Sequence, residues 1–121
     1  MRVLADTAGW IEHLRHGEPL LTNMLSEGMV LMHPFVSGEL ACGTLRNRTA
    51  ILFHLSALPA AKEASTAEAF GLIEDQKPWG RGLGWIDVHL LASARLSHCP
   101  LWTLDKRLVE TARHLQVSFA P

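Results

Sequence analysis

The sequence has few cysteines, no strong excess of either charge and no long hydrophobic run. Two cysteines in 121 residues cannot build the disulfide framework of a small secreted protein. Eleven basic and 12 acidic residues leave a formal net charge of −1, which excludes a polybasic protein that holds nucleic acid by bulk charge. No run approaches the roughly 18 apolar residues of a membrane span, and the opening MRVLADTAGW has no apolar signal core. We therefore expect a cytoplasmic protein without a membrane segment.

The sequence does contain enough apolar material for a folded core. Hydrophobic residues make up 48% and charged residues 19%, which is close to an ordinary globular composition and excludes disorder of the whole chain. No repeat, low-complexity segment or linker divides the sequence. We expect residues 1–121 to form a single domain.

Short apolar runs alternate with stretches of helical periodicity along the chain. Strands are predicted at residues 2–5, 29–32, 101–103 and 117–119, with a further short candidate at 58–61. Helices are predicted from residue 6 or 7 to just before Gly17, and at 18–26, 34–42, 46–57, 65–74, 85–97 and 105–115. This alternation predicts an α/β layered fold in which the strands pair mainly in parallel through right-handed crossovers. Such sheets bind ligands beyond the carboxyl ends of their strands.

The placement of the aspartates is uneven. Of the four, Asp6, Asp87 and Asp105 lie in apolar surroundings, where a carboxylate costs free energy unless a partner compensates its charge. Asp75 lies in an ordinary polar turn. Asp6 and Asp105 each follow a predicted strand and precede a helix, so capping of those helices is an alternative role for both. Capping does not explain Asp87, which falls within an apolar helical stretch.

Simple chain geometry predicts that these carboxylates meet. From Asp87 to the end of its helix the chain descends about 15 Å at about 1.5 Å per residue. The following strand climbs back about 16 Å to Asp105 at about 3.3 Å per residue. Glu39 lies only about 7 Å into the helix that follows the second strand, and Asp6 ends the first strand. We expect all four acids at one rim of the sheet.

Four carboxylates at one rim would repel each other unless a cation joined them. A set of oxygen ligands favours Mg²⁺ or Mn²⁺ over zinc, which prefers nitrogen and sulfur. A metal held in this way activates water for attack on phosphorus, in phosphodiesterases and in phosphatases alike. Thr103, two residues before Asp105, offers a hydroxyl to Asp105 or to the hydration shell of the metal.

Four stretches of the sequence carry a family resemblance. VLADTAGWIEHLR, HPFVSGELACG, GLGWIDVHLLASA and LWTLDKRL follow one another along nearly the whole chain. An Asp after the first strand, a Glu in a GEL context, a WIDxHLL helix and a TxD strand end are together highly specific. The sequence resembles the PIN-domain ribonucleases, in particular the VapC-type toxins of bacterial toxin–antitoxin pairs.

The resemblance implies an α/β/α sandwich and an endoribonuclease that depends on Mg²⁺ or Mn²⁺, with Asp6, Glu39, Asp87 and Asp105 as its catalytic and metal-binding acids. Similar proteins cleave structured RNA, often transfer RNA or a ribosomal RNA loop, and form homodimers. A small antitoxin encoded beside them covers an apolar groove near the first helices and places a basic side chain in the acidic site. These properties are expectations for this chain.

The sequence departs from the family at one motif position. The first motif commonly reads Asp-x-Ser, and here Ala8 takes the third place. An alternative reading is therefore a weakly active or inactive binding module that keeps the fold and pairs with an antitoxin. A phosphatase of the haloacid dehalogenase type is disfavoured, because it needs a second Asp where Ala8 stands.

Other side chains are weighed against plainer roles. His13 and His16 have helical spacing but lack the partners that would complete a zinc site. His33 and His89 are interpreted as packed residues, and Trp85 and Trp102 as core. Candidates for phosphate contacts flank the acidic motifs and the glycine-rich loop 77–84, although each is equally explained as surface charge: Arg46, Arg48, Arg81, Lys106 and Arg107.

Overall fold

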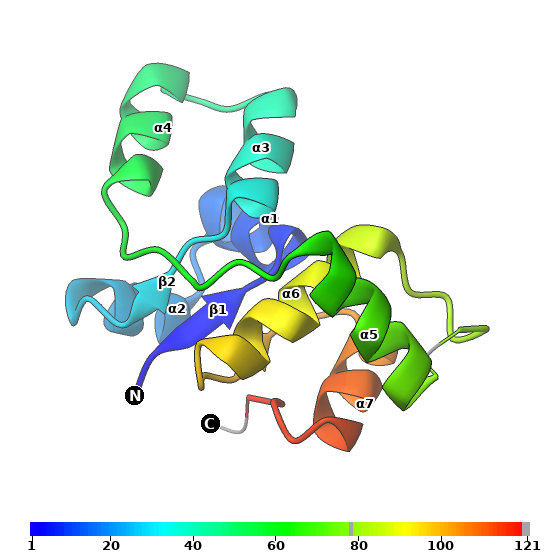
Figure 1. Cartoon of the computed structure of the whole chain (residues 1–121). Helices are drawn as coiled ribbons and strands as arrows, with labels where there is room; N and C mark the ends of the chain where they lie inside the picture. Colours follow the sequence, from blue (N-terminus) through cyan, green and yellow to red (C-terminus); the bar gives the residue numbers. More distant parts are fainter. Residues whose placement is uncertain (78, 120–121) are drawn as a thin grey trace.

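Three parallel strands form the centre of the sheet in the computed structural model, which describes residues 1–77 and 79–119 (Figure 1). The strands are β1 (Val3–Ala5), β2 (Val30–Leu31) and β3 (Leu101–Trp102), in the order β2-β1-β3. β1 pairs with β2 through Val3 opposite Val30, and with β3 through Leu4 opposite Leu101. Parallel bridges at Met32–Ala60 and Leu101–Ser118 add one residue pair at each edge. The strands predicted at 58–61 and 117–119 are therefore reduced to single bridges.

The helices agree with the sequence prediction to within two residues at each end. They are α1 (Thr7–His16), α2 (Pro19–Ser26), α3 (Pro34–Cys42), α4 (Arg48–Ser56), α5 (Thr66–Gln76), α6 (Trp85–Leu96) and α7 (Lys106–His114). Part of the predicted loop before α6, at Pro78, lies outside the described residues.

Local sequence chemistry sets where these helices begin. α2 and α3 start at Pro19 and Pro34, whose rings fix φ near the helical value and whose missing N–H groups cost nothing in a first turn. α5 begins with a capping box. The backbone N–H of Glu68 donates to Oγ of Ser65 at 3.0 Å, and that of Ser65 donates to Oε1 of Glu68 at 2.9 Å.

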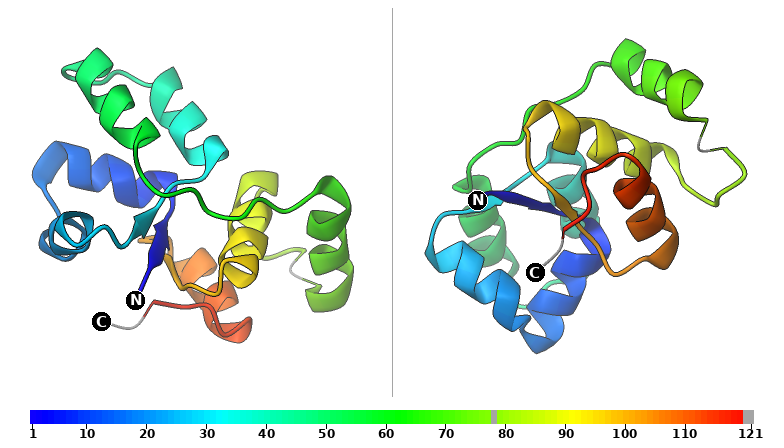
Figure 2. Two further views of the ribbon diagram at one scale, coloured as in Figure 1. Left: turned by 60° about the vertical axis from the view of Figure 1, so that its left-hand side comes forward. Right: turned by 90° about the horizontal axis from the view of Figure 1, so that it is seen from below.

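The helices cover the two faces of the sheet in separate groups, with α1–α4 on one side and α5–α7 on the other (Figure 2). The chain winds outward from β1 through α1–α4, then returns across the sheet through α5 and α6 to β3 on the other side of β1. Right-handed crossovers in opposite directions place helices on opposite faces. The predicted three-layer α/β/α sandwich with a parallel sheet is confirmed.

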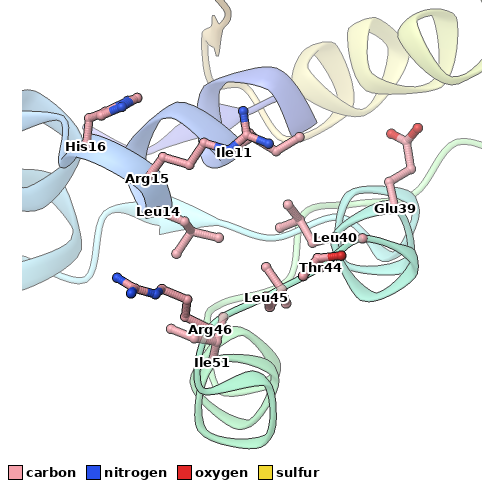
Figure 3. A pocket seen from close by; sticks show the side chains of 11 residues that line it. Ile11, Leu14, Arg15, His16, Glu39, Leu40, Thr44, Leu45, Arg46 and Ile51 are labelled. Carbon is pink, nitrogen blue, oxygen red and sulfur yellow. The ribbon is translucent and has the colours of Figure 1, made fainter.

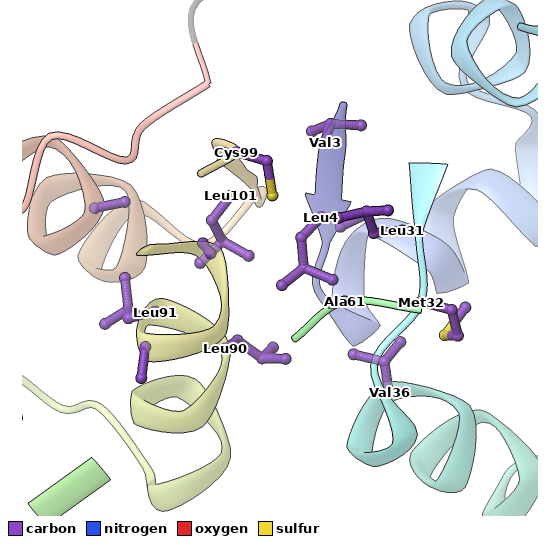
Figure 4. Close-up of a cluster of buried hydrophobic side chains, with 14 of the residues drawn as sticks. Val3, Leu4, Leu31, Met32, Val36, Ala61, Leu90, Leu91, Cys99 and Leu101 are labelled. Atoms are coloured by element: carbon purple, nitrogen blue, oxygen red, sulfur yellow. The ribbon is translucent and has the colours of Figure 1, made fainter. Parts of the chain in front are cut away.

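Aliphatic side chains from the strands and from both helical layers fill the core (Figure 4). All three residues of β1 are buried, as expected for a parallel strand covered on both faces. Leu90 and Leu91 of α6 and Val36 of α3 are also buried. Within residues 1–77 and 79–119, we find no helix with the length and apolar character needed to span a membrane.

Candidate active site

β1 lies between β2 and β3 in the sheet, so the chain leaves β1 toward one edge and later returns to form β3 at the other. The carboxyl end of β1 is therefore the point at which the strand order switches direction. Asp6 directly follows β1, and its backbone N–H donates to the carbonyl of Trp102 in β3 at 3.1 Å. Asp105 lies three residues beyond that carbonyl. A switch point of this kind leaves a crevice between the two connections, where open α/β sheets bind their ligands.

Asp6 is the most buried of the four predicted acids, with 5% of its surface exposed. It caps α1: Oδ1 accepts from the backbone N–H of Gly9 at 2.8 Å, and Oδ2 accepts from the hydroxyl of Thr103. Burial is the largest influence and raises the pKa of Asp6, and the nearby charges of Asp87 and Asp105 raise it further. The two hydrogen bonds act against this shift without cancelling it. The ionised form of Asp6 is therefore disfavoured where no cation balances it.

Thr103 connects Asp6 to the end of β3. Its hydroxyl donates to Asp6 and accepts a hydrogen bond from the backbone N–H of Asp105 at 3.1 Å. We expected this hydroxyl to contact the Asp105 side chain or the hydration shell of a metal. It instead donates to the Asp6 carboxylate, and it contacts Asp105 through the hydrogen bond from the Asp105 backbone N–H. One buried side chain thus fixes both strand ends.

Asp105 caps α7 and lies at the surface, with 36% of its side chain exposed. Oδ1 accepts from the backbone N–H of Arg107 at 2.9 Å and lies 3.6 Å from Nε of the same residue. Partial burial acts to raise the pKa of Asp105, but the backbone N–H groups of Arg107 and Leu108 and the charge of Arg107 together lower it. Asp105 is thus kept ionised beside an arginine.

Asp87 occupies the third position of α6 and is half-buried. Its Oδ2 accepts from the backbone N–H of Gly84 at 3.0 Å. The expectation that capping does not explain Asp87 was therefore wrong. Its carboxylate caps α6 by accepting the backbone N–H of Gly84, the residue that precedes the helix. Asp87 nevertheless lies close enough to Asp6 to raise the pKa of that carboxyl.

Glu39 is exposed on α3 and reaches the rim through Thr7. Its Oε1 accepts from the hydroxyl of Thr7 at 2.6 Å. Thr7 is the first residue of α1 and directly follows Asp6. The contact therefore ties α3 to the chain segment that carries the buried aspartate.

The structure thus brings Asp87 and Asp105 within electrostatic reach of Asp6 and links Glu39 to the same rim through Thr7. Over residues 1–77 and 79–119, no three His, Cys, Asp or Glu side chains lie together closely enough to hold a metal ion. The metal-binding role of the four acids stays a prediction.

Two tryptophans near the rim show features that the sequence analysis missed. The ring of Trp102 packs against Gly9 so closely that a Cβ on Gly9 would lie 2.7 Å from it. This contact packs the first turn of α1 against β3. The only feature of the sequence that could have indicated it is the glycine in the first turn of the helix. Trp85 was predicted in the core, but 40% of its surface is exposed. It lies in the first turn of α6, before the run of buried residues that begins at Val88.

A cavity of about 400 Å³ opens beside the rim, between α1 and the α3–α4 pair (Figure 3). Its wall is mostly aliphatic, and Arg15, Arg46 and Glu39 supply charges at its edge. The aliphatic residues are Ile11, Leu14, Leu40, Leu45 and Ile51. Glu39 lines this cavity and is linked to the acidic rim through Thr7, so the cavity adjoins the rim.

No family model matches the chain. Two curated proteins do, each named ribonuclease VapC32, from the Mycobacterium tuberculosis strains CDC 1551/Oshkosh and ATCC 25618/H37Rv. Each is 37% identical to this chain over 119 residues, which cover 98% of this chain and 96% of the relative. Identity at this level over nearly the full length of both proteins, together with the parallel sandwich and the acids at its switch point, shows that the chain belongs to the VapC family of ribonucleases.

Proposed function

We propose that this VapC-family endoribonuclease is the toxin of a toxin–antitoxin pair and hydrolyses RNA phosphodiester bonds with the help of Mg²⁺ or Mn²⁺. The observation that carries the proposal is the environment of Asp6. A nearly inaccessible carboxylate is hydrogen-bonded in a fixed orientation and lies near two further carboxylates. Such an arrangement is costly without a cation, and it is typical of sites built for one.

The donor set fits a hard divalent cation. Asp6, Glu39, Asp87 and Asp105 offer only oxygen atoms, which Mg²⁺ and Mn²⁺ accept and zinc does not prefer. These four residues would hold the metal, which when bound supplies an activated water and positive charge for the phosphodiester.

The side chains around the acids orient them. Gly9 and Thr103 fix both oxygens of Asp6, so that the carboxylate needs little reorganisation to act as a ligand. Arg107 keeps Asp105 ionised and is itself exposed, which makes it a candidate contact for an RNA phosphate. Arg81, exposed in the loop before α6, is a second candidate.

The hydroxyl groups at the rim favour an active enzyme over the binding-module alternative. Ala8 is exposed and contributes no hydroxyl. Thr7 and Thr103, however, place hydroxyls on Glu39 and Asp6. Two of the four acids therefore have an oriented hydroxyl partner despite the alanine. Membership of the VapC family also argues against the dehalogenase-type phosphatase.

The cavity between α1 and the α3–α4 pair supports an antitoxin as the protein partner. We propose that an apolar segment of a small antitoxin, encoded beside this chain, fills it and carries a basic side chain past Glu39 to the acids. We further propose that the protein acts in the cytoplasm as a homodimer, and that its substrate is a structured RNA such as transfer RNA or a ribosomal RNA loop.

Cleavage of total RNA by the purified protein, free of any partner, tests the proposal. With Mg²⁺ or Mn²⁺ we expect discrete products whose ends identify the target, and no products with EDTA or with Asp6→Asn. Glu12→Gln is the matched control, because Glu12 is an α1 carboxylate that pairs with His16 away from the rim. Cleavage that persists in Asp6→Asn would contradict the assignment. A folded wild type that cleaves nothing with either metal would favour the binding module.

A further inference from the structure

Five rings in successive contact run from the surface of α5 into the core. Phe70 contacts Trp85 with ring centroids 4.9 Å apart, and Trp85 contacts His89 at 4.6 Å. The chain of rings continues from His89 to Phe35 at 4.9 Å and from Phe35 to His33 at 5.0 Å. His33 and His89 are buried, whereas Phe70 is 56% and Trp85 40% exposed.

This arrangement holds the indole of Trp85 in a defined orientation at the surface. His89 meets it edge-on at 80°, and Phe70 lies against it at 46°. The contact with His89 is of the edge-to-face kind that aromatic rings prefer, and the contact with Phe70 is tilted. A large ring that is anchored from within and still exposed offers a preformed surface to a partner.

The chain segment around Trp85 carries one of the four acids and has two arginines nearby in sequence or in space. Trp85 begins α6 two residues before Asp87, and the glycine-rich loop leads directly into it. The side chain of Arg107 lies across that loop, since a Cβ on Gly82 would lie 2.5 Å from its Nη1. Arg81 is exposed in the same loop. The chain segment that carries Asp87 therefore also carries Trp85 and Arg81, and Arg107 lies against it.

We propose that Trp85, supported by Phe70, stacks on a base of a single-stranded part of the RNA substrate next to the cleaved bond. This inference rests on the proposed function and identifies how its substrate is held. Single-stranded RNA is bound by aromatic rings that stack on bases and by basic groups that meet phosphates, which is the combination found here. A second copy of the chain would have less reason to bring an apolar surface against Arg81 and Arg107. Trp85 is thus a substrate-binding residue, distinct from the acids that carry the chemistry.

Three variants separate stacking from other roles of the side chain. With a single-stranded oligonucleotide that contains the mapped cleavage site, Trp85→Leu should raise KM, and the Kd measured by fluorescence anisotropy in EDTA, by roughly 5- to 150-fold, with a smaller change in kcat. Trp85→Phe keeps a ring and should restore most of the affinity. Phe53→Leu is the matched control, because Phe53 is 69% exposed on α4, away from the five rings. It should bind RNA as the wild type does.

Removal of single bases from the oligonucleotide locates the contact. One abasic position beside the cleaved bond should weaken wild-type binding as much as Trp85→Leu does, and should cost that variant nothing more. Equal RNA affinity of the wild type and Trp85→Leu, or equal abasic penalties in both, would overturn the inference. If Trp85→Leu fails to fold, Phe70→Leu replaces it, with a smaller loss in the same direction.

Two further readouts keep this inference separate from its alternatives. If sedimentation shows that Trp85→Leu changes the oligomeric state, and if higher protein concentration restores the KM, the surface is an interface between copies and the inference is wrong. If no cleavage site can be mapped, a single-stranded oligonucleotide of random sequence serves as the probe. Binding of this probe that depends on Trp85, without cleavage, would contradict the proposed function and leave the stacking contact intact.

Discussion

The hydroxyl of Thr103 donates a hydrogen bond to Oδ2 of Asp6, so that a residue following β3 orients the carboxylate that follows β1. Thr103→Val keeps the shape of the side chain but removes this bond and the acceptor for the Asp105 N–H. We expect a loss of roughly 1–3 kcal/mol in the free energy of unfolding, measured in urea. Cleavage should fall by about 10- to 100-fold, as for other partners of metal ligands.

Thr103→Ser is the control for that variant, because it retains the hydroxyl and loses only a methyl group. It should keep most of the cleavage rate. If serine and valine have equal effects, the methyl packing of Thr103 matters and its hydrogen bonds do not.

The raised pKa of Asp6 predicts an unusual stability profile for the metal-free protein. Between the ordinary value of 3.8 and the raised folded value, the folded state binds more protons than the unfolded state. Stability therefore falls as pH rises through this range, and the penalty is fully present above it. Asp6→Asn cannot ionise, so it should be more stable than the wild type at neutral pH in EDTA, with the difference shrinking as pH falls toward 3.8.

Urea unfolding of both proteins across this pH range measures the effect. Asp75→Asn serves as the control, since Asp75 is an exposed aspartate of α5 and should not reproduce the gain at neutral pH. A metal-free Asp6→Asn protein that is less stable than the wild type at neutral pH would mean that the hydrogen bonds of Asp6 outweigh the cost of its burial.

A bound cation should offset the free-energy cost of ionising the buried Asp6 and so stabilise the folded protein. Mn²⁺ or Mg²⁺ at 100 times its Kd should stabilise the wild type by about 2.7 kcal/mol, seen as a rise in Tm that EDTA removes. The rise should be smaller in mildly acidic buffer, because protons compete with the cation for the carboxylates. Asp6→Asn should show little or no rise. The same rise in Asp6→Asn would place the cation elsewhere.

Most of the fold follows from the sequence because its signals are local. Apolar periodicity predicted the helices to within two residues. Pro19, Pro34 and the Ser65 cap, which mark helix starts in the structure, are signals of the same local kind. The predicted strands at 58–61 and 117–119 were too long, since each lies at a sheet edge with a single neighbour and pairs at one residue only.

The site was less predictable where it depends on contacts between distant residues. The positions of Asp6 and Asp105 after strands indicated the rim correctly. The direction of the Thr103 hydroxyl was missed because Thr103 and Asp6 are 97 residues apart. The exposure of Trp85 was missed because periodicity identifies the apolar face of a helix but not which residues of that face other parts of the chain cover.

The contact between Gly9 and Trp102 predicts that even a methyl group is too large at position 9. Gly9→Ala would place its Cβ 2.7 Å from the ring, so the ring or the first turn of α1 must move. We expect a loss of about 1–3 kcal/mol in unfolding free energy from overpacking. Cleavage should also slow, because Asp6 caps the displaced turn.

Gly71→Ala is the matched control for this substitution. Gly71 lies within α5 with no atom within 4 Å of an added Cβ, so the higher helix propensity of alanine should leave stability unchanged or raise it by up to about 1 kcal/mol. If both alanine variants are equally stable, Trp102 accommodates the methyl group and does not position α1.

If the antitoxin binds in the cavity between α1 and the α3–α4 pair, a substitution there should weaken antitoxin binding without changing RNA cleavage. Ile11 is 37% exposed at its wall, and Ile11→Glu would set a charge against the apolar segment that we propose to bind there. The affinity for the antitoxin, measured by calorimetry, should fall by more than about tenfold, whereas the cleavage rate without antitoxin should stay near the wild-type value. Phe53→Glu, on α4 outside the cavity, should change neither. Unaltered inhibition of Ile11→Glu by the antitoxin would move the binding site away from this cavity.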